Sequence, residues 1–398
     1  MPDKNNGEKP ARRTLNAGTI MLALIAAAFG YMVASRLDGL MADKNGVVRR
    51  FFVMNTEATI TIPAEHGSRL SAEQLADIAE EAVREVNRLM SPVGEDSDVV
   101  RFNNAESGTW VTVSPSTWTV VMEGLRWHRL SGGAFDPTIG PLKRLFTFDR
   151  REALVWPSDE DLKDAEARVG ADKIEFEREG MLLSWKKDGM KLDLGAIAKG
   201  YGVDCAVEAL RKNGVVNAVV EVGGEVRTLG QKPGQILPTP WNAGILNPRG
   251  EGTIVISNIS DKAVATSGDY ASYFIYQGKR YEHIIDPRKG LPLSEGVASV
   301  TVIHPESCMS ADALATTLSV LGRVEAGKFL REQALGLFNK GIQVVMLIVE
   351  PDDTITRIDY AIDGQGEFTV KESDAEFLVF GGATQEDDTE VENAVDGE

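Results

Sequence analysis

A carboxylate and a hydroxyl stand four residues apart, as Asp312 and Thr316, in an alanine-rich segment that is typical of a helix. Residues at this spacing lie on one face of a helix, so the two side chains are expected to point in the same direction. Mg²⁺ prefers oxygen ligands and takes few of them from a protein, the rest coming from water and substrate phosphate. The pair therefore predicts a metal site. The alternative is that Asp312 only stabilises a helix N-terminus while Thr316 packs inward.

The segment from Lys191 to Gly202 predicts a strand that ends in Asp193 and runs into a helix carrying Lys199. A helix N-terminus offers free N–H groups and the positive end of its dipole to an anion, and Lys199 adds a full positive charge. This combination suits a pyrophosphate, although its spacing is neither that of a Walker loop nor that of a Rossmann fingerprint. The alternative is an ordinary strand-to-helix turn with a solvated lysine.

Two further segments contain paired glycines that let another group approach the backbone. The segment from Ser131 to Leu142 is so dense in glycine and proline that it predicts a tight loop, in which Phe135 offers an aromatic face and Asp136 an acceptor. The Gly-Gly pair before Glu225 follows a predicted buried strand. Taken alone, the first of these loops is more typical of a plain helix cap and turn.

His283 is the candidate general base among the four histidines, because it stands in the most polar company, between Tyr281 and Lys289. The nearby run from Thr266 to Tyr270 adds hydroxyls and a carboxylate. His128 lies beside a tryptophan on a predicted helix and is interpreted as a surface or packing residue.

The elements that must position these residues alternate between strands and helices. A run of β-branched and aromatic residues predicts one strand over 51–62, and Ser71 with Gln74 has the spacing of a capping box at the start of a helix. Helical periodicity with cap and glycine signals predicts five helices, over 71–90, 114–132, 158–169, 196–212 and 310–321, while 215–222 reads as a buried strand and 344–380 as β-rich.

Charge and composition exclude several classes of protein. The 398 residues include 42 basic and 60 acidic ones, a formal net charge of −18, which argues against nucleic-acid binding through a basic face. With 43% hydrophobic and 26% charged residues the chain is an ordinary globular protein. The two cysteines, Cys205 and Cys308, are too few for a disulfide scaffold or a cysteine-ligated metal centre, and a single disulfide between them is left open.

The N-terminus carries a targeting signal. Basic residues precede an uncharged apolar stretch, Leu15 to Ser35, which is long enough to cross a hydrocarbon core of about 30 Å. Positive charge before it predicts that residues 1–14 are cytoplasmic and that the catalytic domain lies on the extracytoplasmic, periplasmic side of the cell membrane. The alternatives are a cleaved signal peptide, with Val33-Ala34-Ser35 as its cleavage site, and a buried core helix.

The remaining chain divides into a linker over 36–48, one domain over 49–384 and an acidic tail over 385–398. The tail is almost free of large apolar residues and is expected to be disordered.

From about Arg50 to Gly382 the sequence resembles the ApbE family of FAD:protein FMN transferases. The resemblance rests on seven motifs in order: Met90-Ser91 with Asp96-Ser97 and Arg101-Phe102-Asn103, Gly133-Ala-Phe-Asp-Pro-Thr, Asp193-Leu-Gly-Ala-Ile-Ala-Lys-Gly, Gly-Gly-Glu225, Ala265-Thr-Ser-Gly, His283-Ile-Ile-Asp-Pro and Ala311-Asp-Ala-Leu-Ala-Thr.

The resemblance implies an α+β fold, with antiparallel sheets flanked by helices in two lobes and the FAD site in the cleft between them. It implies magnesium-dependent transfer of FMN from FAD to a threonine or serine hydroxyl of a partner protein, with release of AMP. Position by position it assigns Mg²⁺ to the carbonyl of Ala196 with Asp312 and Thr316, deprotonation of the acceptor to His283, and FAD contacts to Met54, Ala134, Phe135, Asp136, Asp193, Lys199 and Ile285.

The expected acceptor is a flavoprotein subunit of a membrane electron-transfer complex, and the enzyme is expected to be a monomer anchored by its N-terminal helix. The sequence departs from the family in having Val93 where an aromatic residue is usual, and in lacking the usual lipoprotein cysteine. Loss of an aromatic stacking partner puts the affinity for the cofactor in question. Two other functions stay open: a metal-dependent FAD pyrophosphatase giving FMN and AMP, and a non-catalytic FAD-binding protein.

Overall fold

An antiparallel sheet runs through the computed structural model, which describes residues 46–146, 156–234, 236–269, 273–294, 296–333, 341–363 and 367–378. Within those ranges the sheet has nine strands in the order β1-β2-β6-β7-β10-β15-β16-β17-β18. Every neighbouring pair is antiparallel. The strands are β1 (Val47–Val53), β2 (Thr56–Ile62), β6 (Ala218–Val222), β7 (Glu225–Leu229), β10 (Ala263–Gly268), β15 (Val297–His304), β16 (Gln343–Val349), β17 (Ile355–Ile362) and β18 (Phe368–Asp374).

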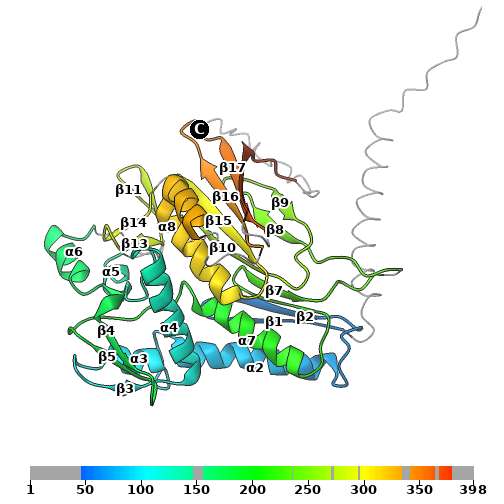
Figure 1. Ribbon diagram of the computed structural model, residues 1–398, viewed down its shortest axis with the longest axis horizontal. Coiled ribbons are helices and arrows are strands. Elements are labelled where there is room, and N and C mark those ends of the chain that lie inside the picture. The colour runs from blue at the N-terminus through cyan, green and yellow to red at the C-terminus, as the bar shows by residue number, and fades with distance from the viewer. Residues whose placement is uncertain are drawn as a thin grey trace, which may run out of the picture.

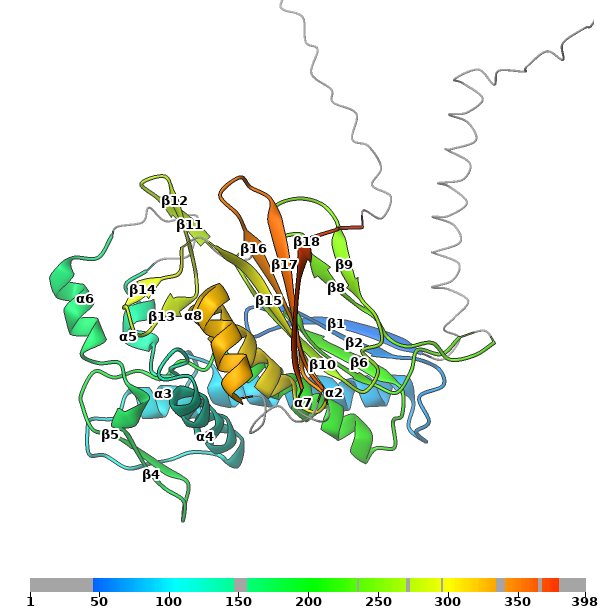
Figure 2. The same cartoon turned by 45° about the horizontal axis from the view of Figure 1, so that its top comes forward.

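Helices cover one face of this sheet and a two-stranded ribbon covers part of the other (Figure 1, Figure 2). The helices are α2 (Ala72–Met90), α7 (Ala198–Lys212) and α8 (Cys308–Gln333), and the ribbon is β8 (Ala243–Leu246) with β9 (Thr253–Ile256). Alternation along β16 shows the two faces: Val344 and Met346 pack in the cluster that holds α8, whereas Val345 and Leu347 pack with the ribbon.

A second group of elements lies beside the sheet and contains the three-stranded sheet β3-β5-β4 (Figure 1). It consists of α3 (Asp98–Asn103), β3 (Val111–Thr112), α4 (Pro115–Leu130), α5 (Gly140–Lys143), α6 (Asp159–Glu166), β4 (Ile174–Glu177) and β5 (Leu182–Trp185). Two short hairpin pairs follow the main sheet's β10: β11 (Tyr273–Tyr276) with β12 (Lys279–Glu282), and β13 (Ile285–Asp286) with β14 (Leu291–Pro292). The prediction of antiparallel sheets flanked by helices is confirmed.

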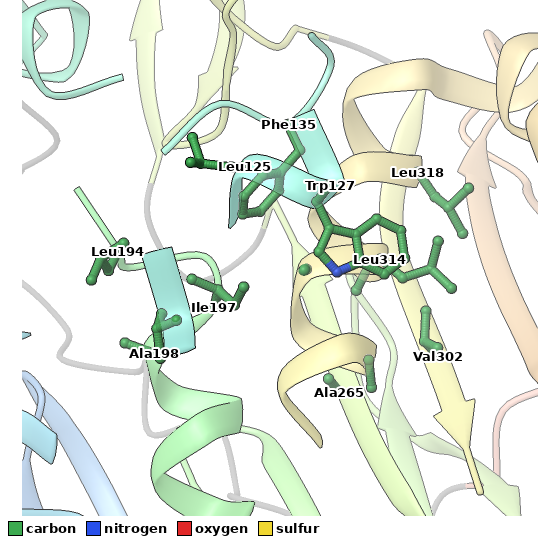
Figure 3. Close-up of a cluster of buried hydrophobic side chains, with 14 of the residues drawn as sticks. Leu125, Trp127, Phe135, Leu194, Ile197, Ala198, Ala265, Val302, Leu314 and Leu318 are labelled. Atoms are coloured by element: carbon green, nitrogen blue, oxygen red, sulfur yellow. The ribbon is translucent and has the colours of Figure 1, made fainter. Parts of the chain in front are cut away.

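One large hydrophobic cluster ties the second group to the main sheet. Trp127 of α4 and Leu314 of α8 are both buried in it, together with Ile197 just before α7 (Figure 3). Phe135, in the loop after α4, belongs to the same cluster and is shown in the same view. The starts of α7 and α8 and the loop after α4 therefore share one core, which fixes their relative positions.

Trp185 anchors the second group of elements. Its ring is 1% exposed and stacks on Phe102 with centroids 4.1 Å apart, and its Nε1 donates to the Phe102 carbonyl at 2.9 Å. We expect Trp185→Ala to lower the free energy of unfolding by about 3–5 kcal/mol, because the cavity it leaves adds to the lost transfer energy. Urea unfolding measures this loss. Trp110→Ala is the control: that side chain is 46% exposed, so a comparable loss there would contradict the assignment.

Capping residues mark the starts of the helices, in one case at another residue than the sequence predicted. The capping box before α2 is present, with the Ser71 hydroxyl accepting from the Gln74 N–H and the Gln74 side chain accepting from the Ser71 N–H. The predicted helix over 310–321 starts earlier, at Cys308, because the Ser307 hydroxyl, not that of Ser310, accepts from the backbone at its N-terminus. Gly322 interrupts α8 with φ 70°, where the sequence predicts that the helix ends.

The prediction of one strand over 51–62 is wrong, because the segment belongs to a hairpin. Met54 and Asn55 both have positive φ, 51° and 60°, and turn the chain between β1 and β2. Two positive φ values are what a tight hairpin turn needs, but Met is an unusual residue for it, so the usual glycine signal was missing.

Several predictions on the ends of the chain fall outside the described residues: the cytoplasmic segment 1–14, the apolar segment 15–35, residues 36–45 of the linker and the tail 385–398. Within the part that is described, every helix is too short or too polar to span a bilayer. Cys205 and Cys308 are both free thiols, so the disulfide left open by the sequence is absent.

Candidate active site

A cavity of about 750 Å³ opens where the main sheet meets the loop after α4, the turn before α7 and the first part of α8. Its size is typical of sites for small organic ligands. Ten of the eleven site residues predicted from the sequence line it: Ala134, Phe135, Asp136, Asp193, Ala196, Lys199, His283, Ile285, Asp312 and Thr316.

The eleventh, Met54, lies in the turn between β1 and β2, outside the cavity lining. Its side chain packs close to Gly202 of α7, where an added Cβ would lie 3.3 Å from its Cε. Val93, at the position where the family usually has an aromatic residue, is 74% exposed and also lies outside the lining. The cavity therefore has its aromatic surfaces elsewhere, from Phe135 and Trp241.

Lys199, which lines the cavity, lies between two buried carboxylates. Its Nζ is 2.8 Å from Glu225 Oε1 and 3.9 Å from Asp312 Oδ1, and both carboxylate side chains are 3% exposed. Burial raises the pKa of Glu225 and that of Asp312, while the charge of Lys199 limits both shifts. Although burial disfavours the ammonium, the attraction of the two carboxylates raises the pKa of Lys199, so it stays charged.

Glu225 is the residue whose role sequence reasoning missed. It appeared only as the end of a Gly-Gly motif, because its partner Lys199 lies 26 positions away along the chain. The sequence reasoning also missed Lys143 of α5, which lines the cavity. Its Nζ lies 2.8 Å from Asp193 Oδ2. Asp193 Oδ1 accepts a hydrogen bond from the Gly195 N–H at 2.9 Å. The turn before α7 thus carries a fixed carboxylate with a lysine beside it.

Asp312 is held by the N-terminal turn of α7. Its Oδ2 accepts a hydrogen bond from the Gly200 N–H at 3.0 Å. The approach is possible because Gly200 has no side chain: a Cβ there would lie 2.3 Å from the Cys308 carbonyl oxygen and 2.8 Å from Met309 Cα. The two motifs that the sequence separates by more than a hundred residues are therefore in backbone contact.

The residues assigned to Mg²⁺ fit a hard cation. Asp312 and Thr316 both face the cavity that Ala196 also lines, and they offer a carboxylate, a hydroxyl and a carbonyl, all oxygen donors. Thr316 Oγ1 lies 3.1 Å from Ser267 Oγ, which fixes the position of the hydroxyl. Among the described residues there is no cluster of three or more His, Cys, Asp or Glu side chains that could hold a metal alone. This donor set suits an ion that is also bound by phosphate and water.

Asp136 uses one carboxylate oxygen within the loop that borders the cavity and the other to tie that loop to a distant segment. Oδ1 accepts from the Thr138 backbone N–H at 2.7 Å and Oδ2 from the Ala171 N–H at 3.1 Å. His128 Nδ1 lies 3.1 Å from Asp136 Oδ2, and that contact raises the pKa of His128. Asp136 thus shapes the loop, and His128 is a half-buried partner of it, in agreement with its interpretation as a packing residue.

His283 lines the cavity immediately after Glu282, the last residue of β12. Glu282 is 6% exposed, and burial, with repulsion from Asp269, raises its pKa to about 8 despite the charges of Arg280 and Arg249. Asp269 is itself held by Arg249, whose Nη1 donates to Oδ1 at 2.7 Å. The residue that precedes the base candidate is therefore a buried carboxyl group with a raised pKa.

Glu282 predicts a decline of stability as pH rises. Its pKa is about 8 in the folded protein against an ordinary 4.5, so between these values the folded state keeps a proton that the unfolded chain loses. The free energy of unfolding must fall with rising pH through this window and level off above about pH 8. We expect Glu282→Gln to flatten the decline, as measured by urea unfolding at pH 5.5, 7 and 8.5. The exposed Glu175→Gln is the control. Parallel curves for wild type and Glu282→Gln would contradict the prediction.

Comparison with known proteins identifies the class of this fold and site. The model of the ApbE family matches residues 54–338. A protein of Vibrio cholerae named FAD:protein FMN transferase is 39% identical over 68% of this chain and 78% of its own length, and one of that name from Haemophilus influenzae is 34% identical over 71% and 80%. The chain belongs to the ApbE family.

Solved structures show the same fold. The flavin transferase ApbE from Vibrio cholerae superposes with a TM-score of 0.68 at 32% identity, covering 84% of this chain and 99% of that one. The ApbE protein from Thermotoga maritima gives a TM-score of 0.67 at 34% identity, covering 78% and 96%. The α+β architecture predicted from the sequence is thus that of the family.

Proposed function

We propose that this chain is a magnesium-dependent FAD:protein FMN transferase that moves FMN from FAD to a threonine or serine hydroxyl of a partner protein and releases AMP. The observation that carries the proposal is that Lys199, His283, Asp312 and Thr316, from three separate segments, line one cavity of a size suited to a nucleotide cofactor. The relatives described above are named FAD:protein FMN transferases, which supports the same activity.

The chain's own residues can carry the steps of this reaction. His283 accepts the proton of the acceptor hydroxyl, whose oxygen forms a bond to the FMN phosphorus. The anhydride bond to AMP breaks, AMP leaves with the electron pair of that bond, and a phosphoester joins FMN to the acceptor. Lys199 lies in the same cavity with its charge maintained, so it can stabilise the negative charge of the pyrophosphate.

Asp312, Thr316 and the Ala196 carbonyl would hold the Mg²⁺, which neutralises charge on the anhydride when it is bound. Asp312 is oriented for this before any ligand enters, because the Gly200 N–H fixes one of its oxygens. The other oxygen faces Lys199 at 3.9 Å. Phe135 and Trp241, also in the lining, offer aromatic surfaces for the ring systems of the dinucleotide.

The partners and the location of the enzyme are part of the proposal. The apolar stretch Leu15 to Ser35, preceded by basic residues, supports an N-terminal membrane anchor with the catalytic domain on the periplasmic side. An anchored enzyme would work on a flavoprotein subunit of a membrane electron-transfer complex. The excess of acidic residues argues against a nucleic-acid partner. We propose that the enzyme acts as a monomer.

The test incubates the full chain with FAD, Mg²⁺ and a candidate acceptor that carries an Asp-x-x-Thr segment, and then measures the intact mass of the acceptor. A gain of one FMN that disappears when the metal is chelated supports the transferase. Free FMN and AMP without a mass gain would instead show a pyrophosphatase. FAD that is bound but unchanged, with every acceptor tried, would leave a flavin-binding protein without catalysis.

A further inference from the structure

The ammonium of Lys199 lies near two carboxylates, those of Glu225 and Asp312, and it is closer to Glu225. It contacts Glu225 Oε1 at 2.8 Å and stays 3.9 Å from Asp312 Oδ1. Both carboxylates are buried, and Lys199 itself is 25% exposed at the cavity. The difference of more than 1 Å leaves the Asp312 oxygen on that side without a direct contact to the ammonium.

Asp312 is also the carboxylate that is assigned to the metal ion. Its Oδ2 is taken by the Gly200 N–H, so Oδ1 is the oxygen that remains for a cation. A lysine ammonium and a divalent cation would compete for that oxygen, because both are positive and both gain from a buried anion. Whatever holds Lys199 away from Oδ1 therefore protects the metal site.

The position of Glu225 allows it to hold Lys199 away from Asp312 Oδ1. It is the first residue of β7 and pairs with Val222 across the hairpin. Gly223 and Gly224, which both have positive φ, form the turn, and a Cβ on Gly223 would lie 2.7 Å from Thr56 Cγ2. The backbone in front of Glu225 thus packs closely against a neighbouring strand, and the Glu225 side chain is buried, with 3% of its surface exposed.

We propose that Glu225 is a positioning residue that holds the Lys199 ammonium away from Asp312 and so keeps Asp312 available to a divalent cation. The inference rests on the proposed function, because it takes Asp312 as the metal ligand. Without Glu225, the only carboxylate in contact range of Lys199 among the described residues is Asp312, and the lysine moves onto it.

The test measures Mn²⁺ binding to the full chain by the loss of the free-ion electron paramagnetic resonance signal, with FAD present to supply its phosphates, no acceptor, and Mn²⁺ with FAD alone as the blank. We expect Glu225→Gln to weaken Mn²⁺ binding about tenfold, since one charged hydrogen bond shifts from one partner to the other. Removing the lysine as well, in the double variant Lys199→Met with Glu225→Gln, restores binding to near the wild-type value. The double variant also shows that any loss in the single variant is not a folding defect.

Glu225→Asp separates positioning from simple loss of charge. The shorter side chain keeps the negative charge but retreats from Lys199 by about one methylene, so positioning predicts weakened Mn²⁺ binding in this variant too. Wild-type affinity in Glu225→Asp would show that only charge matters and would overturn the inference. Wild-type affinity in Glu225→Gln would overturn it as well.

The outcomes also separate this inference from the proposed function. If wild-type protein binds no Mn²⁺, or if Asp312→Asn binds it as tightly as the wild type, the metal assignment fails, and the inference fails with it. If wild type binds Mn²⁺ and modifies the acceptor while all Glu225 variants bind equally well, the proposed function stands and only the role of Glu225 is wrong.

Discussion

Replacing Asp312 with asparagine is expected to lower the rate of FMN transfer by about 10³-fold or more. A bound metal is worth several kcal/mol of charge stabilisation in the transition state, and each 1.36 kcal/mol is a factor of ten in rate. Asparagine keeps an oxygen that can accept from the Gly200 N–H, so the contact between α7 and α8 is retained. The change also replaces a buried carboxyl group, whose pKa is raised by burial, with a neutral amide, so it adds no new cost of burying a charge.

The measurement is the initial rate of mass gain on the acceptor at saturating FAD and Mg²⁺. Thermal unfolding run in parallel shows whether the fold is kept. Asp359→Asn is the matched control, because Asp359 lies on β17 paired with Arg357 and takes no part in lining the cavity. If Asp312→Asn transfers FMN at a rate near that of the control, Asp312 is not a ligand of the metal.

Replacing His283 with glutamine is expected to slow transfer by about 10²–10⁴-fold, the usual contribution of a general base. Glutamine fills similar space and can form hydrogen bonds, but it cannot take a proton from the acceptor hydroxyl. The affinity for FAD, read from quenching of flavin fluorescence, should change little because the rest of the lining is intact. A loss of rate without a loss of FAD binding is therefore the signature of the base.

A second histidine provides the control for this experiment. His66 lies after β2, outside the cavity lining, and its Nδ1 accepts from the Ser68 N–H at 3.2 Å. His66→Gln should transfer FMN at the wild-type rate. If His283→Gln also does so, the acceptor hydroxyl loses its proton to another group, and His283 only lines the site.

The sequence predicted the parts of the fold that depend on neighbours along the chain. The start of α2 follows from Ser71 and Gln74, three positions apart, and the break in α8 follows from Gly322. The turn at Met54 and Asn55 was missed because its conformation is imposed by the pairing of β1 with β2, without the glycine that usually signals it. Local chemistry is visible in a sequence, whereas the partner of a strand is not.

The candidate site shows the same division. The types of residue and the family's motifs were enough to name ten residues that line one cavity. They could not reveal that Glu225 holds Lys199, that Lys143 pairs with Asp193, or that Asp136 Oδ2 accepts from the Ala171 N–H. Each of these contacts is set by packing between distant segments, and no spacing along the chain encodes it.

The backbone contact at Gly200 has a consequence for how such a site can change. Because Gly200 touches Cys308 and Met309 with no room for a side chain, the starts of α7 and α8 cannot shift independently. A mutation that moves one helix must be matched by a movement of the other, so substitutions near the lysine motif and the aspartate motif constrain one another. An engineer who grafts this site onto another scaffold would have to transplant the crossing of the two helices along with the side chains.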